Sequence, residues 1–167
     1  MKKIYALFLL PGLFLASCGS GTSVSDPEDI GPQVMEILED LDDMSKEEFK
    51  EYFMSLEDIR ELGEDEDLIK DEDGRNFLTK IEKDEYTEDL ERGFTRVIEN
   101  GSEQGIKWSE IEFDDFSYKI ETRNGIKGCD GELTFKHGGD SYQVRTTSIW
   151  DGSGYNLLSI KGPRKKR

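Results

Sequence analysis

The residues of this chain best suited to covalent chemistry are its two cysteines, Cys18 and Cys129. Cys18 follows two small residues at the end of an apolar N-terminal segment, and Lys2 and Lys3 give that segment a positive start. The apolar run is shorter than the roughly 20 residues that a membrane-spanning helix needs. These features are typical of a secretory signal peptide, which we expect to cover residues 1–17 and to be removed from the mature protein.

The four residues Leu15-Ala16-Ser17-Cys18 resemble the lipobox of bacterial lipoproteins. The resemblance implies that the Cys18 sulfur receives a diacylglycerol, that cleavage falls between Ser17 and Cys18, and that the new amine receives a further acyl chain such as palmitate. Several acyl chains, each contributing about 0.8 kcal/mol per buried methylene, hold a protein on a membrane almost permanently. The resemblance therefore implies a membrane anchor at Cys18 in the bacterial cell envelope, at the outer membrane. The alternative is an ordinary signal peptide followed by a chance cysteine.

We interpret the second cysteine as a structural residue. With Cys18 acylated, Cys129 has no cysteine left to pair with, so we expect no internal disulfide. A catalytic thiol needs a base beside it, and the only histidine of the sequence, His137, falls at a predicted hairpin turn. A Cys129–His137 pair stays open as an alternative, but we predict that Cys129 is a small strand residue and that the chain has no catalytic residues.

Residues 64–74 (EDEDLIKDEDG) form the densest acidic segment, and clustered carboxylates are ligands that calcium prefers. Their spacing does not fit an EF-hand. With Gly74 at the sixth position of such a loop, the first ligand would be Ile69 and the twelfth would be Lys80, and neither side chain binds calcium. We therefore predict no metal and no other cofactor, and we interpret the segment as a solvated linker between helices.

The charge of the chain excludes one large class of partners. The precursor has 22 basic and 38 acidic residues, a formal charge of −16, and removal of Lys2 and Lys3 takes the mature chain to −18. The phosphates of nucleic acids repel so acidic a protein, and we expect no nucleic-acid binding. Anionic lipid headgroups repel it as well, which leaves the lipid on Cys18 to hold it at the membrane.

The spacing of apolar side chains predicts helices in the first part of the mature chain. Residues 18–27 are small and polar, and we expect a flexible tether there. Ser45 and Glu48 form a capping box at the start of the second helix, and Asn100-Gly101 is typical of a helix end. The predicted helices cover residues 30–41, 45–63 and 84–100, with a short helical turn at 77–81.

From residue 106 onward the apolar period changes to two, which predicts β-strands. Asn124-Gly125 is a strong hairpin signal, and a change of parity at Asp114-Asp115 indicates a β-bulge. Two further turns, at 137–140 and 151–154, complete an antiparallel meander of four strands. We expect the basic residues 163–167 to form a frayed tail. Contact with the chain's own carboxylates and contact with a phosphate-rich membrane surface are the alternatives for this tail.

The order of these elements predicts an α+β fold, with N-terminal helices packed on the four-stranded meander in a single domain over residues 28–162. This order resembles the cystatin-like cone shared by ketosteroid isomerase and nuclear-transport-factor-like proteins. The resemblance implies a curved sheet with a cavity, in which an enzyme would use an aspartate base and a hydrogen-bond donor. Asp115 with Tyr118 or Tyr142 could take those roles, although Asp114-Asp115 is more simply a bulge.

Several short patterns are similar to small uncharacterised lipoproteins of Bacteroidota: residues 48–53, 57–59, 105–113 and 133–135. This resemblance implies a location and a domain type, and it implies no activity. We therefore expect a non-enzymatic binding or accessory module of the envelope, whose partner is an envelope protein.

Aromatic side chains dominate the binding energy of many interfaces, and Trp108, Trp150 and Tyr155 are the candidate binding surface. A place in the sheet core is the alternative for all three, and for Trp150 it is the favoured interpretation. The alternative function is a carrier of a small apolar ligand, or an enzyme, using a cavity in the curved sheet.

Overall fold

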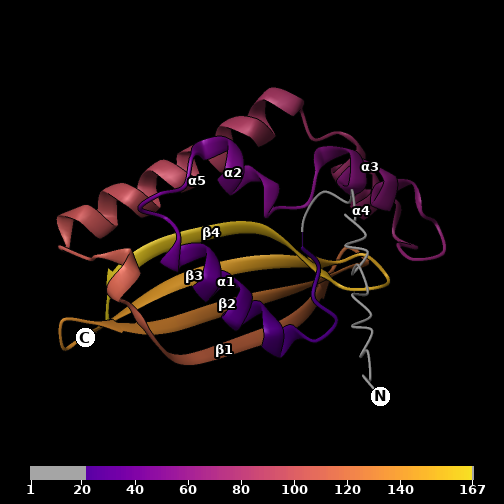
Figure 1. Cartoon of the computed structure of the whole chain (residues 1–167). Coiled ribbons are helices and arrows are strands. Elements are labelled where there is room, and N and C mark those ends of the chain that lie inside the picture. Colours follow the sequence, from indigo (N-terminus) through magenta and orange to yellow (C-terminus); the bar gives the residue numbers. More distant parts are fainter. Residues whose placement is uncertain (1–21, 167) are drawn as a thin grey trace, which may run out of the picture.

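The structure is a computed structural model that describes residues 22–166 of the chain (Figure 1). The predicted signal peptide, the cleavage between Ser17 and Cys18 and the lipidation of Cys18 lie outside these residues. Within residues 22–166, no helix is both long enough and apolar enough to cross a membrane.

Four antiparallel strands in the order β1-β2-β3-β4 form one sheet, which confirms the predicted meander and the α+β fold. The strands are β1 (Glu112–Arg123), β2 (Ile126–His137), β3 (Asp140–Trp150) and β4 (Tyr155–Lys165). Asn124 and Gly125 have positive φ angles of 49° and 73°, as a two-residue hairpin turn requires. The predicted hairpin is therefore confirmed. The pairing of β1 with β2 shifts between Phe113 and Asp115, which confirms the predicted bulge.

Helical segments precede the sheet in the chain. They are η1 (Pro27–Asp29), α1 (Ile30–Glu39), α2 (Lys46–Glu51), α3 (Leu56–Glu64), α4 (Glu72–Thr79), α5 (Lys83–Glu103) and the short η2 (Trp108–Glu110). Ser45 and Glu48 form the predicted capping box at the start of α2. Figure 1 shows α1 lying across one face of the sheet, whereas α5 lies alongside β4 and beyond it.

The predicted helix over residues 45–63 is two helices, α2 and α3. The helix breaks because the chain at Phe53 and Met54 pairs with β4, where the Met54 N–H donates to the Leu157 carbonyl (2.9 Å). Ser55 then caps α3. Around α3 and α4 lies a second, smaller hydrophobic cluster with the buried members Met54, Ile59, Leu62, Ile69, Leu78 and Ile149.

The end of α5 differs from the prediction, which placed it at Asn100-Gly101. The helix continues to Glu103, and the left-handed conformation beyond its end belongs to Gly105, with φ 66°. Gly101 serves a different purpose. The Trp108 indole lies against it, and a Cβ at this position would be 2.4 Å from the ring atom Cζ2. The glycine after Asn100 therefore permits a close packing contact rather than a turn.

The acidic segment 64–74 is only in part the predicted linker. Asp71 caps α4 by accepting a hydrogen bond from the Gly74 N–H (2.9 Å), so the last residues of the segment are helical. Gly74 itself packs against the β1–β2 turn, where a Cβ would lie 2.0 Å from the Asn124 carbonyl oxygen. In the part of the chain that the structure describes, no group of three His, Cys, Asp or Glu side chains is placed to hold a metal ion.

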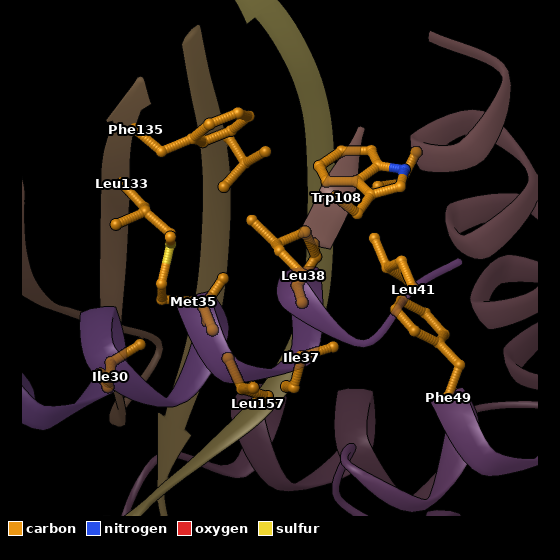
Figure 2. Packing of buried hydrophobic residues seen from close by; sticks show 14 of the residues in the cluster. Ile30, Met35, Ile37, Leu38, Leu41, Phe49, Trp108, Leu133, Phe135 and Leu157 are labelled. Atoms are coloured by element: carbon orange, nitrogen blue, oxygen red, sulfur yellow. The ribbon is translucent and has the colours of Figure 1, made fainter. Parts of the chain in front are cut away.

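The main core lies between α1 and the face of the sheet that α1 covers. Figure 2 shows Met35 of α1 pointing toward Leu133 of β2, with Leu38 beside it. Six side chains of this cluster have no measurable exposure: Val34, Leu38, Val97, Leu133, Phe135 and Val144. Gly31 lets α1 approach β1 closely, since a Cβ there would stand 2.5 Å from the Phe116 ring. This face of the sheet is therefore occupied by packed side chains.

The folded domain begins before the predicted start at residue 28. Val24 falls in the predicted tether, yet its N–H donates to the Tyr155 carbonyl (3.0 Å) and its carbonyl accepts from the Tyr155 N–H (2.7 Å). The prediction of a flexible tether is therefore wrong at Val24, which is bonded to the first residue of β4. A single valine among small polar residues gives no periodic signal, so the pattern could not reveal this pairing.

The domain also ends later than the predicted residue 162. β4 runs to Lys165, so the prediction of a frayed tail is wrong for residues 163–165. Two side chains of this segment contact the chain's own carboxylates: Arg164 with Glu132 (2.9 Å) and Lys165 with Asp140 (2.6 Å). The first alternative for the tail is therefore what the structure contains.

Candidate functional site

The aromatic side chains predicted as a binding surface are mostly covered. Trp108 and Tyr155 are each only 2 % exposed, so the prediction is wrong for both. Trp108 packs between Gly101 and Phe135, and the centroids of the Trp108 and Phe135 rings are 6.0 Å apart. Trp150 is half-buried and lies against the Tyr155 ring, with the centroids 5.0 Å apart. These rings contribute mainly to the core, which is the alternative for all three and the favoured interpretation for Trp150.

The residues considered for an isomerase-like site do not come together. In the pairing of the strands, Asp115 lies opposite Thr134, whereas Tyr142 lies opposite the next residue, Phe135. Successive strand residues point to opposite faces of a sheet. Asp115 therefore points away from the face that carries Tyr142 and Tyr118, and the structure forms no acid–hydroxyl pair from them.

Cys129 and His137 do not form a nucleophile–base pair. Both lie on β2 and are eight residues apart, which corresponds to about 27 Å along a strand. Cys129 is 1 % exposed, and its burial, followed by the neighbouring Asp130 carboxylate, raises the pKa of its thiol to about 11. The His137 Nε2 atom accepts a hydrogen bond from the Lys107 N–H (3.3 Å) instead. A buried, protonated thiol without a base is a structural group.

A cleft of about 530 Å³ opens between α5 and β4, and its lining includes side chains from both faces of the sheet, such as Ile160 of the main core and Lys161 of the opposite face. From α5 it is lined by residues at helical spacing, Asp89, Gly93, Arg96 and Asn100, with Arg92 beside them. Apolar side chains form its floor, and they include Phe49, Phe53, Tyr86, Leu90, Leu158 and Ile160. The strands contribute polar side chains, Arg145, Ser159, Lys161 and Arg164. The size is typical of a site for a small organic molecule.

Hydrogen bonds between the elements fix the two ends of the cleft. At one end, the Tyr86 hydroxyl donates to the Met54 carbonyl (2.6 Å), and the burial of this phenol raises its pKa. At the other end, the Gln104 side chain donates to the Pro163 carbonyl (3.0 Å). The Gln104 bond joins α5 directly to β4. The Tyr86 bond joins α5 to the segment between α2 and α3, where the Met54 N–H is bonded in turn to Leu157 of β4.

The side chains around the cleft are strongly cationic. Five are basic and one, Asp89, is acidic, in a chain with 22 basic and 38 acidic residues. Arg92 forms ion pairs with Asp89 and with Glu88 (3.8 Å), and Arg164 pairs with Glu132 (2.9 Å). The other three basic side chains, Arg96, Arg145 and Lys161, have no carboxylate within 4.0 Å among residues 22–166.

Arg145 and Lys161 lie directly opposite each other in the pairing of β3 with β4. Their side chains therefore project from the same face of the sheet, where like charges directly opposite are destabilising. Arginine presents a rigid fork of donors that matches carboxylate and phosphate oxygens, and lysine adds a compact charge. The lining includes neither histidine nor cysteine. The arrangement can hold an anion.

The comparisons with known proteins add no relative from which a role could be transferred. No protein-family model, no curated protein and no solved structure matches this chain.

Proposed function

We propose that this chain is a lipoprotein of the bacterial cell envelope, held at the outer membrane by lipid on Cys18, and that it acts as a non-enzymatic binding module. Its ligand or partner binds at the cleft between α5 and β4. The observation that carries the proposal is the cluster of five basic side chains around one cleft of a protein whose formal charge is −16. The lipobox residues support the location.

The chemistry of the cleft favours binding over catalysis. Arginine stays charged at every physiological pH, so Arg92, Arg96, Arg145 and Arg164 act as fixed electrostatic contacts rather than as acids or bases. The Tyr86 hydroxyl already donates to the Met54 carbonyl, and burial raises its pKa. The Tyr86 hydroxyl therefore stays protonated, and its hydrogen bond to the Met54 carbonyl helps to fix one end of the cleft.

The side chains on the sheet face that α1 covers are closely packed. That face, where the cone resemblance would place a ligand, carries α1 and the fully buried Leu133, Phe135 and Val144. The α5–β4 cleft is open, partly apolar and partly charged, which is the usual composition of a site for a small ligand.

The anchor is tested by changing one cysteine at a time in the full precursor, expressed in a bacterium with two membranes. Wild-type protein should incorporate labelled palmitate and enter the detergent phase after extraction. The Cys18→Ser variant should do neither, because it lacks the sulfur that receives the lipid. Cys129→Ser is the matched control and should behave like wild type. Recovery of the wild-type protein in the aqueous phase would contradict the proposal.

Binding is tested by native mass spectrometry of protein extracted gently from its own membrane. We expect a mass beyond that of the lipid, from a small molecule or a partner protein. The double variant Arg145→Gln/Lys161→Gln should lose this mass, because it neutralises the two unpaired strand cations of the cleft. A bound species that the double variant retains in full would place the binding site elsewhere.

A further inference from the structure

We propose that the ligand of the α5–β4 cleft is a small organic anion. Its carboxylate or phosphate group binds Arg96, Arg145 and Lys161, and its apolar part lies on the floor of the cleft beside Tyr86 and Leu158. This inference rests on the proposed function, and it adds the chemical class of the ligand.

Arg145 and Lys161 differ from the other basic side chains on their face of the sheet. Three other basic side chains on that face have acidic partners at short distance: Arg123 with Asp130 (3.4 Å), Arg164 with Glu132 (2.9 Å), and Lys136 with Asp114 (2.5 Å). Arg145 and Lys161 face each other, and neither has a carboxylate within 4.0 Å among the described residues. Glu132 lies opposite Arg145 on β2, but its carboxylate pairs with Arg164 instead. A bound anion would supply the negative charge that the fold provides for the other cations.

The helix shows the same contrast. Arg92 has Glu88 and Asp89 one turn before it, and it forms ion pairs with both. Arg96 has Arg92 and Gly93 in the equivalent positions, so its guanidinium receives no carboxylate from the preceding turn. At Gly93 the helix runs close to β4, since a Cβ there would lie 3.7 Å from the Ile160 carbonyl oxygen.

The frame of the cleft sets the size and the kind of ligand. Side-chain bonds close it at Tyr86 on one side and at Gln104 on the other. A volume of about 530 Å³ accepts a molecule rather than a protein domain. A nucleic acid is repelled by the charge of the whole chain, whereas a small anion senses mainly the cations nearest to it.

The test uses the mature lipoprotein in nanodiscs of phosphatidylcholine, with calorimetric titration of phenyl phosphate, benzoate, inorganic phosphate and phenol. Phenyl phosphate and benzoate should bind more tightly than phenol, which lacks the charge, and phenyl phosphate more tightly than inorganic phosphate, which lacks the apolar ring. Binding should weaken as salt rises from about 0.05 to about 0.5 M, because exposed cations are screened. In Arg145→Glu and Lys161→Glu, the Kd for phenyl phosphate should rise at least about tenfold.

Lys70→Glu is the matched control, since Lys70 is exposed and does not line the cleft. It makes the same change of net charge and should leave the Kd unchanged. Arg145→Gln, which adds no repulsion, guards against a folding defect and should also weaken binding. Equal weakening by Lys70→Glu, or tight binding of phenol alone, would overturn the anion proposal.

Two further measurements separate this inference from the proposed function and identify the source of the anion. A neutral molecule found by native mass spectrometry, and lost in the Arg145→Gln/Lys161→Gln variant, would leave the binding module intact and overturn the anionic ligand. Nanodiscs that contain phosphatidylglycerol should compete with phenyl phosphate if the anion is a lipid headgroup. They should leave its binding unchanged if the anion is a free small molecule.

Discussion

Two glycines of α5 should respond to the same substitution with opposite signs. Replacement of glycine by alanine inside a helix stabilises it by about 1 kcal/mol, because alanine loses less backbone entropy on folding. At Gly93 the nearest atom outside the helix backbone would lie 3.7 Å from the new Cβ, an ordinary contact. Gly93→Ala should therefore raise the free energy of unfolding by about 1 kcal/mol.

At Gly101 the same methyl group meets the Trp108 indole at 2.4 Å, more than 1 Å inside the usual separation of about 3.5–4.0 Å. The indole is 2 % exposed and packs on Phe135, so it has little room to move. Overpacking of this kind costs about 1–3 kcal/mol. At the upper end of that range, the helix gain leaves Gly101→Ala destabilised by about 2 kcal/mol.

Urea unfolding of the purified Cys18→Ser protein, followed by circular dichroism, measures both effects as shifts in midpoint at unchanged slope. For a chain of this size, Gly101→Ala should lower the Tm by about 4–8 °C and Gly93→Ala should raise it by about 2–4 °C. In a Trp108→Phe background the penalty at Gly101 should shrink, because the smaller ring removes the atoms in conflict. Stabilisation by both alanines would refute the packing argument.

Two ionisable groups should give the stability a defined pH dependence, measured by urea unfolding across the pH range. Burial, followed by the Asp130 carboxylate, raises the pKa of Cys129 from 9.0 to about 11, so the folded chain keeps a proton that the unfolded chain loses. The free energy of unfolding should fall as pH rises from about 9 to about 11, and Cys129→Ala should lack this component. Burial would raise the pKa of Asp151, but hydrogen bonds from the Ser153 and Gly154 N–H groups outweigh it and lower the pKa. Stability should therefore be lost as pH falls through that depressed value, and an unchanged acid profile in Asp151→Asn would contradict this assignment.

The parts of the fold that follow from short-range chemistry could be predicted from the sequence. The Asn124-Gly125 turn and the Ser45 capping box depend on a few neighbouring residues, and both are present. The helix end predicted at Asn100-Gly101 is wrong, because the sequence does not distinguish a glycine that makes room for a neighbouring indole ring from a glycine that ends a helix. The alternation of apolar and polar residues along the strands shows which side chains share a face of the sheet, but not which face a helix covers. The burial of Tyr155 could therefore not be predicted.

The cleft could not be predicted because it depends on one irregularity in the pairing of β3 with β4. Trp150 lies opposite Tyr155, and uninterrupted pairing from that turn would place Arg145 opposite Ile160. A register shift between Thr147 and Ser148 moves the partner to Lys161 and so brings two cations together. A shift of one residue reverses the face of every side chain beyond it, and no feature of the sequence predicts the shift between Thr147 and Ser148.

The bonds between Val24 and Tyr155 set a limit on how far the domain can travel. In the proposed mature protein, only six residue steps separate the lipidated Cys18 from Val24. An extended chain spans about 3.3–3.6 Å per residue, so the segment between Cys18 and Val24 can be about 20 Å long at most. This maximum distance is less than three times the Debye length, which is about 8 Å at physiological salt. With Cys18 lipidated as proposed, the domain would stay in a thin layer above the bilayer, and its ligand would have to reach that layer by diffusion along the membrane or by approach to its surface.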